Sequence, residues 1–590
     1  MERSAFTFMQ RPVTRRNFLA GGAAAGGMLA AHPLLTKSES LLHNGVAAST
    51  RSSGGVKVLT AVTSSVASGF DRDGPNTDPG FGEANYNCFY PLIHYPQPLS
   101  KGAYVPNFSA KANQFVPVLA ESWQSEGPLR WVMKLRKGVY SAAGNEFNSA
   151  DVVYTFARAK SISGSASNSW FLSNVAGILS FAPVLPGAKP SDKKLHGEVV
   201  ALDRYTVQFN LFEPSGLFFF MALTDINLSP FDSVEMKKHA TAADPWSHTW
   251  GNANAAGYGP YHVTSWNPGV ELIYQATPNW FQGKPEYGTV VTTAVAEGGS
   301  RLAALEAGDA QIASYLEPPE LAKLKTNSNV SLIGAYTNQI NFMCLSYNYA
   351  PWNLPKNQLL RQAVAYSIPY DNIVKLNYLG FGRRMYSQIP SSFAGYKQIK
   401  TYSTNLSKAR SLLAQAGFPG GSGLSQYSSG LQMYFVSERS TLLEPIANQI
   451  RTNLASIGIN VTLQPLPQAE FATKQLQTHD LPMSIFDFSS PSVPDAGFVC
   501  QLLYQSQKAG GLVDPTNFAN ATFDKLSGQA KSASGAKRTA LLHQMQDILM
   551  SQLPTIPLVE ALPVEAMRKP ISGWFVPTEA TVPLYAYVKS

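Results

Sequence analysis

Alternation of hydrophobic and polar residues recurs in short runs along the chain and predicts β-strands. The stretch Gly257–Glu306 contains three such runs, at Tyr261–Trp266, Val270–Ala276 and around Thr289–Ala296, separated by turns rich in Gly and Pro. It ends in a helix that contains Arg301–Leu305, so we expect a rigid sheet and helix here. Further strands are predicted at Val56–Thr63, Arg130–Leu135, Gly197–Ala201, Thr206–Leu211, Asn341–Tyr347, Asn460–Pro465, Pro482–Phe488 and Thr555–Glu560.

Hydrophobic residues three and four positions apart predict helices between these strands. Asn148 is expected to cap one of them, with Asp151 in its first turn. Since helices and strands alternate, we expect α/β lobes. The other predicted helices are Pro214–Ala222, Asn357–Ile368, Asp371–Tyr378, Leu406–Ala416, Leu443–Ile457, Phe471–Thr478, Phe523–Ala533 and Lys537–Ser551.

Length and charge limit the classes of protein that the chain can belong to. With 590 residues it is too long for one hydrophobic core, so two or three lobes are expected. The formal net charge is +8 and no segment is rich in Lys or Arg, so no nucleic-acid partner is expected. Cys88, Cys344 and Cys500 lie far apart without a CxxC pair, and we expect small buried side chains that bind no metal.

The N-terminal residues have the pattern of an export signal. Arg15-Arg16 precedes a short apolar run, Phe18–Ala31, which resembles the twin-arginine signal. The run is too short for a membrane span, which needs roughly 20 apolar residues. No cysteine lies in or just after it, so a lipid anchor is not expected. Cleavage after Ala31 or after the Ala47-Ala48 pair remains open, and Thr36–Gly55 is expected to be a flexible tether.

Blocks of sequence spread over Val56–Ser590 carry a resemblance to a known family. They are Leu119–Trp123, Leu135–Val139, Asp151–Tyr154, Gly257–Tyr261, Trp266, Pro268-Gly269, Asn279, Gly283–Pro285, Arg361–Tyr366, Ile373-Val374, Lys408–Arg410, Ala416–Phe418, Ile446–Gly458, Phe523–Leu526 and Pro554–Leu558. In this order they resemble the extracellular solute-binding proteins of family 5. These are the peptide- and nickel-type receptors of ATP-binding-cassette (ABC) importers.

The resemblance implies an α/β fold like that of the periplasmic binding proteins, of the large cluster C type. Two lobes in three regions would place mixed sheets around a ligand cleft. The regions would be a signal peptide and tether at 1–55; a discontinuous lobe I of 56–92, 240–338 and 553–590; region II at 93–239, inserted in lobe I; and lobe II, also called region III, at 339–552.

The resemblance also implies a function without catalysis. The protein would capture an oligopeptide or similar polar solute and deliver it to the permease subunits of an ABC transporter at the membrane. We expect a monomer without a cofactor, soluble and exported to the periplasm or to the outer face of the cytoplasmic membrane.

Ligand contacts are implied in both lobes. They are Asn85 and Tyr86 after the first strand, Trp250 and Asn252 before the Gly257 turn, and Cys344, Tyr347, Phe486, Asp487 and Phe488 on strands that face the cleft in relatives. Any aromatic residue in this set could instead belong to a hydrophobic core.

One segment departs from the family pattern. Peptide-binding relatives carry an aspartate after the strand that corresponds to Pro482–Phe488, and it pairs with the α-ammonium of the peptide. Here the segment Ser489–Asp495 has a serine at the matching position. Because a buried ammonium without a carboxylate is costly, either Asp487 or Asp495 takes this role or the ligand has no free N-terminus. Blocked peptides, glycosides, metal chelates and other polar metabolites therefore remain open.

An enzymatic function is the alternative to a receptor. The chain has no G-x-S-x-G, HExxH, GxxxxGK[ST] or DxDxDG motif, and His239, His248 and His262 are too far apart to form a metal pair on one helix. An exported sensory receptor remains an alternative function, as does, with less support, an exported hydrolase.

Overall fold

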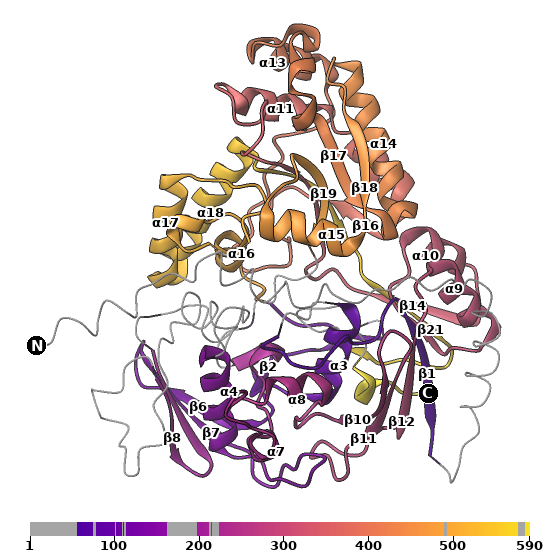
Figure 1. Cartoon of the computed structure of the whole chain (residues 1–590), viewed down its shortest axis with the longest axis vertical. Coiled ribbons are helices and arrows are strands. Elements are labelled where there is room, and N and C mark those ends of the chain that lie inside the picture. Colours follow the sequence, from indigo (N-terminus) through magenta and orange to yellow (C-terminus); the bar gives the residue numbers. More distant parts are fainter. Residues whose placement is uncertain are drawn as a thin grey trace, which may run out of the picture. The chain divides into compact units, whose positions relative to one another are not determined.

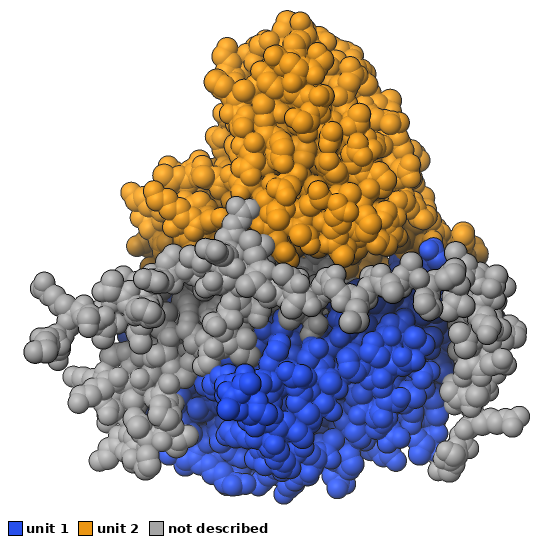
Figure 2. Space-filling model, viewed as in Figure 1, with its two compact units in different colours: residues 1–316, 327–333, 565–590 blue, residues 317–326, 334–564 orange. Residues whose placement is uncertain are grey.

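The computed structural model describes residues 56–74, 78–100, 102–108, 110, 114–161, 198–211, 214, 223–488, 493–511, 513–575 and 584–590. The predicted export signal and tether lie outside these residues, as does the helix predicted at Pro214–Ala222 apart from Pro214. The chain folds as two compact units (Figure 2). Unit 1 contains the described residues up to Leu316 together with 327–333 and 565–590, and unit 2 contains 317–326 and 334–564.

A seven-stranded mixed sheet forms the centre of unit 1, in the order β10-β11-β12-β1-β13-β21-β14. β1 runs parallel to β12 and β13, whereas β10, β11 and β12 form an antiparallel meander. This meander confirms the three strands predicted within Gly257–Glu306. The bounds are β1 Val58–Thr63, β10 Tyr261–Asn267, β11 Glu271–Ala276, β12 Thr289–Ala294, β13 Ile312–Ala313, β14 Val330–Gly334 and β21 Val564–Arg568.

The other sheets of unit 1 are smaller. A four-stranded antiparallel sheet has the order β6-β7-β9-β8, and α4 packs against β8 and β9. The bounds are β2 Ile93–His94, β3 Leu99–Ser100, β4 Ala103–Tyr104, β5 Val116–Pro117, β6 Ala120–Ser125, β7 Arg130–Leu135, β8 Glu198–Asp203, β9 Thr206–Asn210 and β22 Trp574–Phe575. The helices described in this unit are α3 Pro79–Cys88, α4 Ser149–Ser161, η3 Ile226–Leu228, α7 Ser233–Lys238, α8 His248–Ala253, α9 Gly298–Ala307 and η10 Tyr585–Tyr587.

The predicted start of α4 is confirmed. Asn148 Oδ1 accepts a hydrogen bond from the Ala150 amide at 2.9 Å, and Asp151 Oδ2 accepts one from the Asn148 amide at 2.8 Å. This reciprocal pattern satisfies amide groups that have no partner inside the helix. Asp151 also accepts from the Ser233 amide at 2.9 Å, which ties α4 to α7.

A six-stranded mixed sheet forms the centre of unit 2, in the order β16-β20-β15-β19-β17-β18. α14 packs along β17 and β18 (Figure 1). The strands are β15 Ile340–Leu345, β16 Gly382–Arg384, β17 Gln432–Val436, β18 Thr462–Leu466, β19 Met483–Phe488 and β20 Thr555–Ala561. The helices are α10 Pro318–Leu324, α11 Asn357–Ser367, α12 Tyr370–Asn372, η4 Ile373–Asn377, α13 Leu406–Gln415, η5 Pro419–Gly421, η6 Leu424–Leu431, η7 Ser437–Arg439, α14 Ser440–Ser456, α15 Gln468–Ala472, η8 Thr473–Thr478, α16 Ala496–Leu503, η9 Gln507–Ala509, α17 Ala521–Ser532 and α18 Gly535–Gln552.

The boundaries of the units differ from the predicted lobes at three places. Residues 317–326 and 334–338 belong to unit 2, although the sequence assigned them to lobe I. β20, also assigned to lobe I, pairs with β15 and β16 inside the sheet of unit 2. The separation of region II from lobe I within unit 1 stays a prediction.

Candidate functional site

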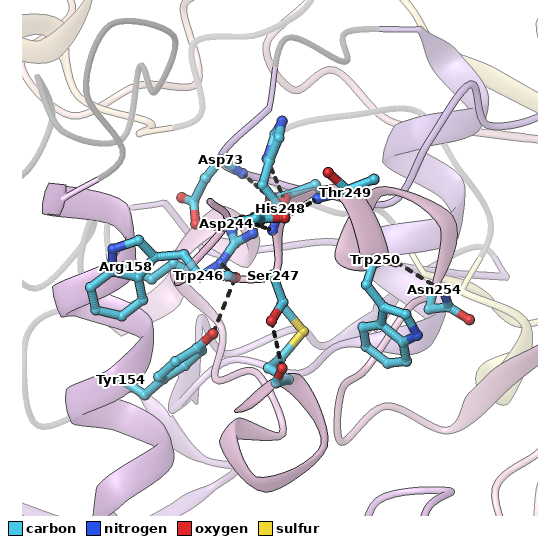
Figure 3. Close-up of polar contacts among 12 residues, drawn as sticks. Asp73, Tyr154, Arg158, Asp244, Trp246, Ser247, His248, Thr249, Trp250 and Asn254 are labelled. Carbon is cyan, nitrogen blue, oxygen red and sulfur yellow. Dashed lines mark hydrogen bonds and ion pairs between the residues drawn. The ribbon is translucent and has the colours of Figure 1, made fainter. Parts of the chain in front are cut away.

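The predicted ligand residues Trp250 and Asn252 lie on α8 in unit 1 (Figure 3). Asp244 fixes the start of this short helix, because its carboxylate accepts hydrogen bonds from the amides of His248 and Thr249, each at 2.8 Å. The indole of Trp250 stacks on His239 with ring centroids 4.0 Å apart and planes at 6°. Trp250 is therefore held in one orientation while remaining half-exposed.

A buried ion cluster connects α8 to α4. Arg158 on α4 donates to Asp71 Oδ1 at 2.7 Å and pairs with Asp73, and its Nε donates to the Trp246 carbonyl at 3.0 Å. His248 Nδ1 lies 2.8 Å from Asp71 Oδ2. Burial alone would raise the pKa of Asp71, but its hydrogen bonds with Arg158 and His248 outweigh burial and hold that pKa well below its usual range. In Figure 3, Trp250 lies on the opposite side of this cluster from Arg158.

Asn252 packs on the segment that follows β1. Its carbonyl accepts a hydrogen bond from the Phe70 amide at 3.0 Å. A Cβ atom on Gly69 would lie 2.2 Å from Asn252 Oδ1, so a larger residue at position 69 would displace the Asn252 side chain from this position. The rigid attachment of α8 thus depends on contacts with residues far away in sequence.

Asn85 and Tyr86 lie on α3, which the sequence analysis did not predict as a helix. Their side chains are 1% and 4% exposed. Asn85 Nδ2 donates to the Phe81 carbonyl at 2.9 Å, while its buried Oδ1 has no hydrogen-bond partner in the described part of the chain. The turn that opens at Gly257 packs on the end of this helix, where the Gly259 amide donates to the Cys88 carbonyl at 2.9 Å.

In unit 2, the predicted residues on β15 and β19 divide between the two faces of the sheet. Cys344 pairs with Ser484, and Phe342 with Phe486, across the two strands. Because side chains alternate along a strand, Cys344 and Phe486 share one face and Asp487 lies on the other. Phe486 packs against Phe342 and is 6% exposed. The side chain of Phe488 lies outside the described structure, although its backbone pairs with Ile340.

Cys344 lies in the interior of unit 2, and Tyr347, two residues after β15, is half-buried. Cys344 is 1% exposed, and burial raises the pKa of its thiol to about 12. The guanidinium of Arg361 stacks over the ring of Tyr347 at 3.7 Å, and the Tyr347 hydroxyl donates to the Gln552 carbonyl at 3.3 Å. These contacts are those of packed residues.

Asp487 belongs to a cluster of three charged side chains that the sequence analysis did not identify. Arg439, the last residue of η7, donates from Nε to Glu317 Oε1 at 2.6 Å and from Nη2 to Oε2 at 3.2 Å. Its Nη1 pairs with Asp487. Burial lowers the pKa of Arg439, but Glu317 more than offsets this and raises it above the ordinary value. The side chains of Arg439, Glu317 and Asp487 are 25%, 24% and 31% exposed, so solvent reaches all three.

Asp495, the other candidate for the ammonium partner, is engaged within unit 2. Its Oδ1 caps α16 by accepting from the amides of Gly497 at 2.7 Å and Phe498 at 3.2 Å. Arg538 donates to both of its carboxylate oxygens, each at 2.7 Å. With 1% exposure and two sets of partners, this carboxylate has a structural role that argues against ligand binding. Residues 489–492, which belong to the divergent segment, lie outside the described residues.

The described ranges also bear on metal binding and membrane insertion. Within them, no group of three or more His, Cys, Asp or Glu side chains could hold a metal ion. No helix that the structure describes is both long and apolar enough to cross a bilayer. The three cysteines are buried and unpaired by disulfides.

The mixed sheets and flanking helices of the two units are those of the periplasmic-binding-protein fold, cluster C type. The sequence model described as bacterial extracellular solute-binding proteins, family 5 (middle region), matches residues 114–510. The chain therefore belongs to this family, as its sequence blocks predicted.

Similar proteins support this assignment. The glutathione-binding protein GsiB of Escherichia coli O1:K1 is 25% identical over 468 residues, which cover 78% of this chain and 83% of the relative. The dipeptide-binding protein of E. coli K12 is 24% identical over 484 residues, covering 80% and 85%. The periplasmic binding protein DppA from Helicobacter pylori, solved with the peptide STSA, is 23% identical with a TM-score of 0.71, covering 90% and 97%. These comparisons confirm the predicted fold and the assignment to a family of binding proteins.

Proposed function

We propose that this protein is the substrate-binding component of an ABC importer and captures an oligopeptide or similar polar solute for a membrane permease. Membership of the solute-binding family, over a match that includes parts of both units, carries the proposal. The names of two relatives, glutathione-binding and dipeptide-binding, support a small peptide-like ligand. The protein would act as a soluble exported monomer, and it would release its ligand chemically unchanged.

The cluster Glu317–Arg439–Asp487 supports a charged group on the ligand. One guanidinium and two carboxylates leave this cluster with a net charge of −1. Arg439 is shared between Glu317, with which it makes two hydrogen bonds, and Asp487, so one carboxylate charge is not balanced, and we assign it to Asp487. Its side chain is also the most exposed of the three at 31%. A ligand ammonium would balance this charge, and Asp487 is therefore the partner that we propose for it.

Trp250 and Asn252 are the contacts that we propose in unit 1. Both are half-exposed, and the indole is already oriented by its stacking on His239. A rigid aromatic surface contributes to affinity because little conformational freedom is lost when a ligand binds. Asn85, Tyr86, Cys344 and Phe486 are almost fully buried, so their proposed contacts with ligand have less support.

Native mass spectrometry of the exported protein tests the proposal. We expect a co-purified solute with a free amino group, which dissociates intact on mild denaturation. A solute recovered only as cleavage products would overturn the proposal in favour of a hydrolase.

A further inference from the structure

A cavity of about 530 Å³ opens on unit 1 and involves none of the residues proposed to bind the transported solute. This volume lies in the range of small-molecule sites. Its walls come from the start of β1, the residue after α9, the residue before β13, the end of β21 and the segment that follows it, together with Tyr287 and Ser590. The polar lining includes Lys57, Gln311, Arg568, Lys569 and Ser590.

Two of the three cations in this cavity have no carboxylate partner. Lys57 pairs with Glu286 at 2.7 Å and also donates to the Ser590 hydroxyl at 3.1 Å. Arg568 and Lys569, by contrast, form no ion pair with any residue that the structure describes. Adjacent cations in a concave site attract anions and repel other cations. The cavity therefore has an excess of positive charge.

The guanidinium of Arg568 is fixed by hydrogen bonds from one of its nitrogens, and the donors on its other edge are left without an acceptor in the part of the chain that the structure describes. Its Nη1 donates to the carbonyls of Leu305 at 2.9 Å and Glu306 at 3.0 Å, at the end of α9. Its Nε and Nη2 have no hydrogen-bond partner among the described residues. A planar pair of N–H donors held in place matches two oxygens of a carboxylate or phosphate.

Gly308 and Gln311 complete the polar wall. Gly308 ends α9 with φ of +90°, and a Cβ atom there would lie 3.3 Å from Arg568 Cζ, so glycine leaves the face of the guanidinium open. Gln311 Oε1 accepts from the Thr60 amide at 3.0 Å. This contact orients the amide group, whose Nε2 makes no hydrogen bond within the described ranges and remains a donor.

We propose that this cavity binds a small free oxyanion, a carboxylate- or phosphate-bearing solute, held by Arg568, Lys569 and the Gln311 amide. The apolar wall of Val56, Val58 and Ile571 would contact the carbon skeleton of such a solute. It is a second binding site on the receptor, distinct in charge from the Asp487 cluster, which favours a cation.

Isothermal titration of the exported protein with inorganic phosphate and with citrate, at constant ionic strength, tests the proposal. We expect saturable binding of one anion per chain. Gln311→Glu keeps the acceptor for the Thr60 amide but adds a negative charge, and Lys569→Gln removes an exposed cation. Each should weaken binding at least about tenfold, which corresponds to about 1.4 kcal/mol.

Lys284→Gln is the matched control, since Lys284 is an exposed lysine of unit 1 outside the cavity. It should bind both anions as the wild type does, and all variants should keep the wild-type affinity for the transported solute. Absence of saturable binding, or equal binding by Gln311→Glu, would overturn the proposal. If the protein sediments with phosphatidylglycerol vesicles but binds neither free anion, the proposal is overturned in favour of a contact with the membrane.

Discussion

Arg439 and Glu317 form a two-point ion pair across 122 positions of the chain, with N–O distances of 2.6 and 3.2 Å. The pair fixes η7 to the residue that precedes α10, within unit 2. It also presents the third member of the cluster, Asp487, to solvent. The three charged side chains of this cluster therefore come together only in the folded protein.

Arg439→Gln is expected to lower the free energy of unfolding by about 1–2 kcal/mol, because Glu317 and Asp487 lose their shared cation and repel each other. Thermal and urea unfolding measure the change. Arg451→Gln is the control, since Arg451 is an exposed arginine of α14 that donates a hydrogen bond to Asn448 Oδ1. Equal stability of the two variants would show that the cluster contributes nothing measurable.

Asp487→Asn and Asp495→Asn are expected to have opposite effects. Asp487→Asn should weaken binding of a ligand with a free ammonium by roughly 10- to 100-fold, as expected for a charge-assisted hydrogen bond of about 1.5–3 kcal/mol, and change stability little. Asp495→Asn should leave affinity unchanged but destabilise unit 2 by about 3 kcal/mol, because Arg538 loses its buried partner. Titration calorimetry and unfolding of both variants separate the two roles. Unchanged affinity in Asp487→Asn would remove Asp487 from the site.

Glu83 is expected to make the protein more stable at acidic pH. Burial raises the pKa of this carboxyl to about 7, although the hydroxyls of Tyr585 and Tyr274 donate to it at 3.0 and 3.2 Å. The native state therefore keeps a proton that the unfolded chain releases near pH 4.5. The contribution of Glu83 to stability should fall by about 3 kcal/mol as pH rises from 4.5 through 7, and then level off.

Glu83→Gln keeps an oxygen acceptor for both tyrosines and removes the titration. Urea unfolding of the two proteins at pH 5 and pH 8 measures the difference. The variant should lose the contribution of Glu83, while burial also raises the pKa values of Asp514 and Glu565, which keep theirs. Glu286→Gln, at an exposed ion pair, should keep the contribution of Glu83. An identical fall of stability in wild type and Glu83→Gln would contradict the assignment to Glu83.

Most elements of the fold could be predicted from local patterns. β7 has the predicted bounds, Arg130–Leu135, and α4 begins where Asn148 and Asp151 indicated. α3 was missed because Gly80, Gly82 and two asparagines give it a low helix propensity, although Asp78 and Pro79 are a typical helix start. α16 was missed as well, and its cap, Asp495, was interpreted as a ligand residue.

The candidate site could be predicted only in part. The alternation along Phe486-Asp487-Phe488 can be read from the sequence, and it already predicts that Asp487 and its two neighbours lie on opposite faces of the strand. No local pattern connects Arg439 to Glu317, since that contact depends on tertiary packing over 122 residues. The same is true of the cavity in unit 1, where Gln311 and Arg568 come from segments far apart in sequence.

Arg15→Lys/Arg16→Lys is expected to block export if the leader is a twin-arginine signal, because that route depends on the paired arginines. Both residues lie outside the described structure, so the prediction rests on sequence alone. Immunoblotting of cell and exported fractions measures it, with Arg11→Lys as the control. Normal secretion of the double variant would contradict the proposed route.

The central claim is that the protein binds a polar, amino-bearing solute and leaves it unchanged. The most direct measurement is titration calorimetry with the co-purified solute and with its N-acetylated form, followed by mass spectrometry of the recovered ligand. We expect saturable binding of the free amine, binding of the acetylated form weaker by roughly 10- to 100-fold, and full recovery of both masses. Equal binding of the two forms would contradict the role of Asp487, and a changed ligand mass would contradict the claim that this protein is a receptor.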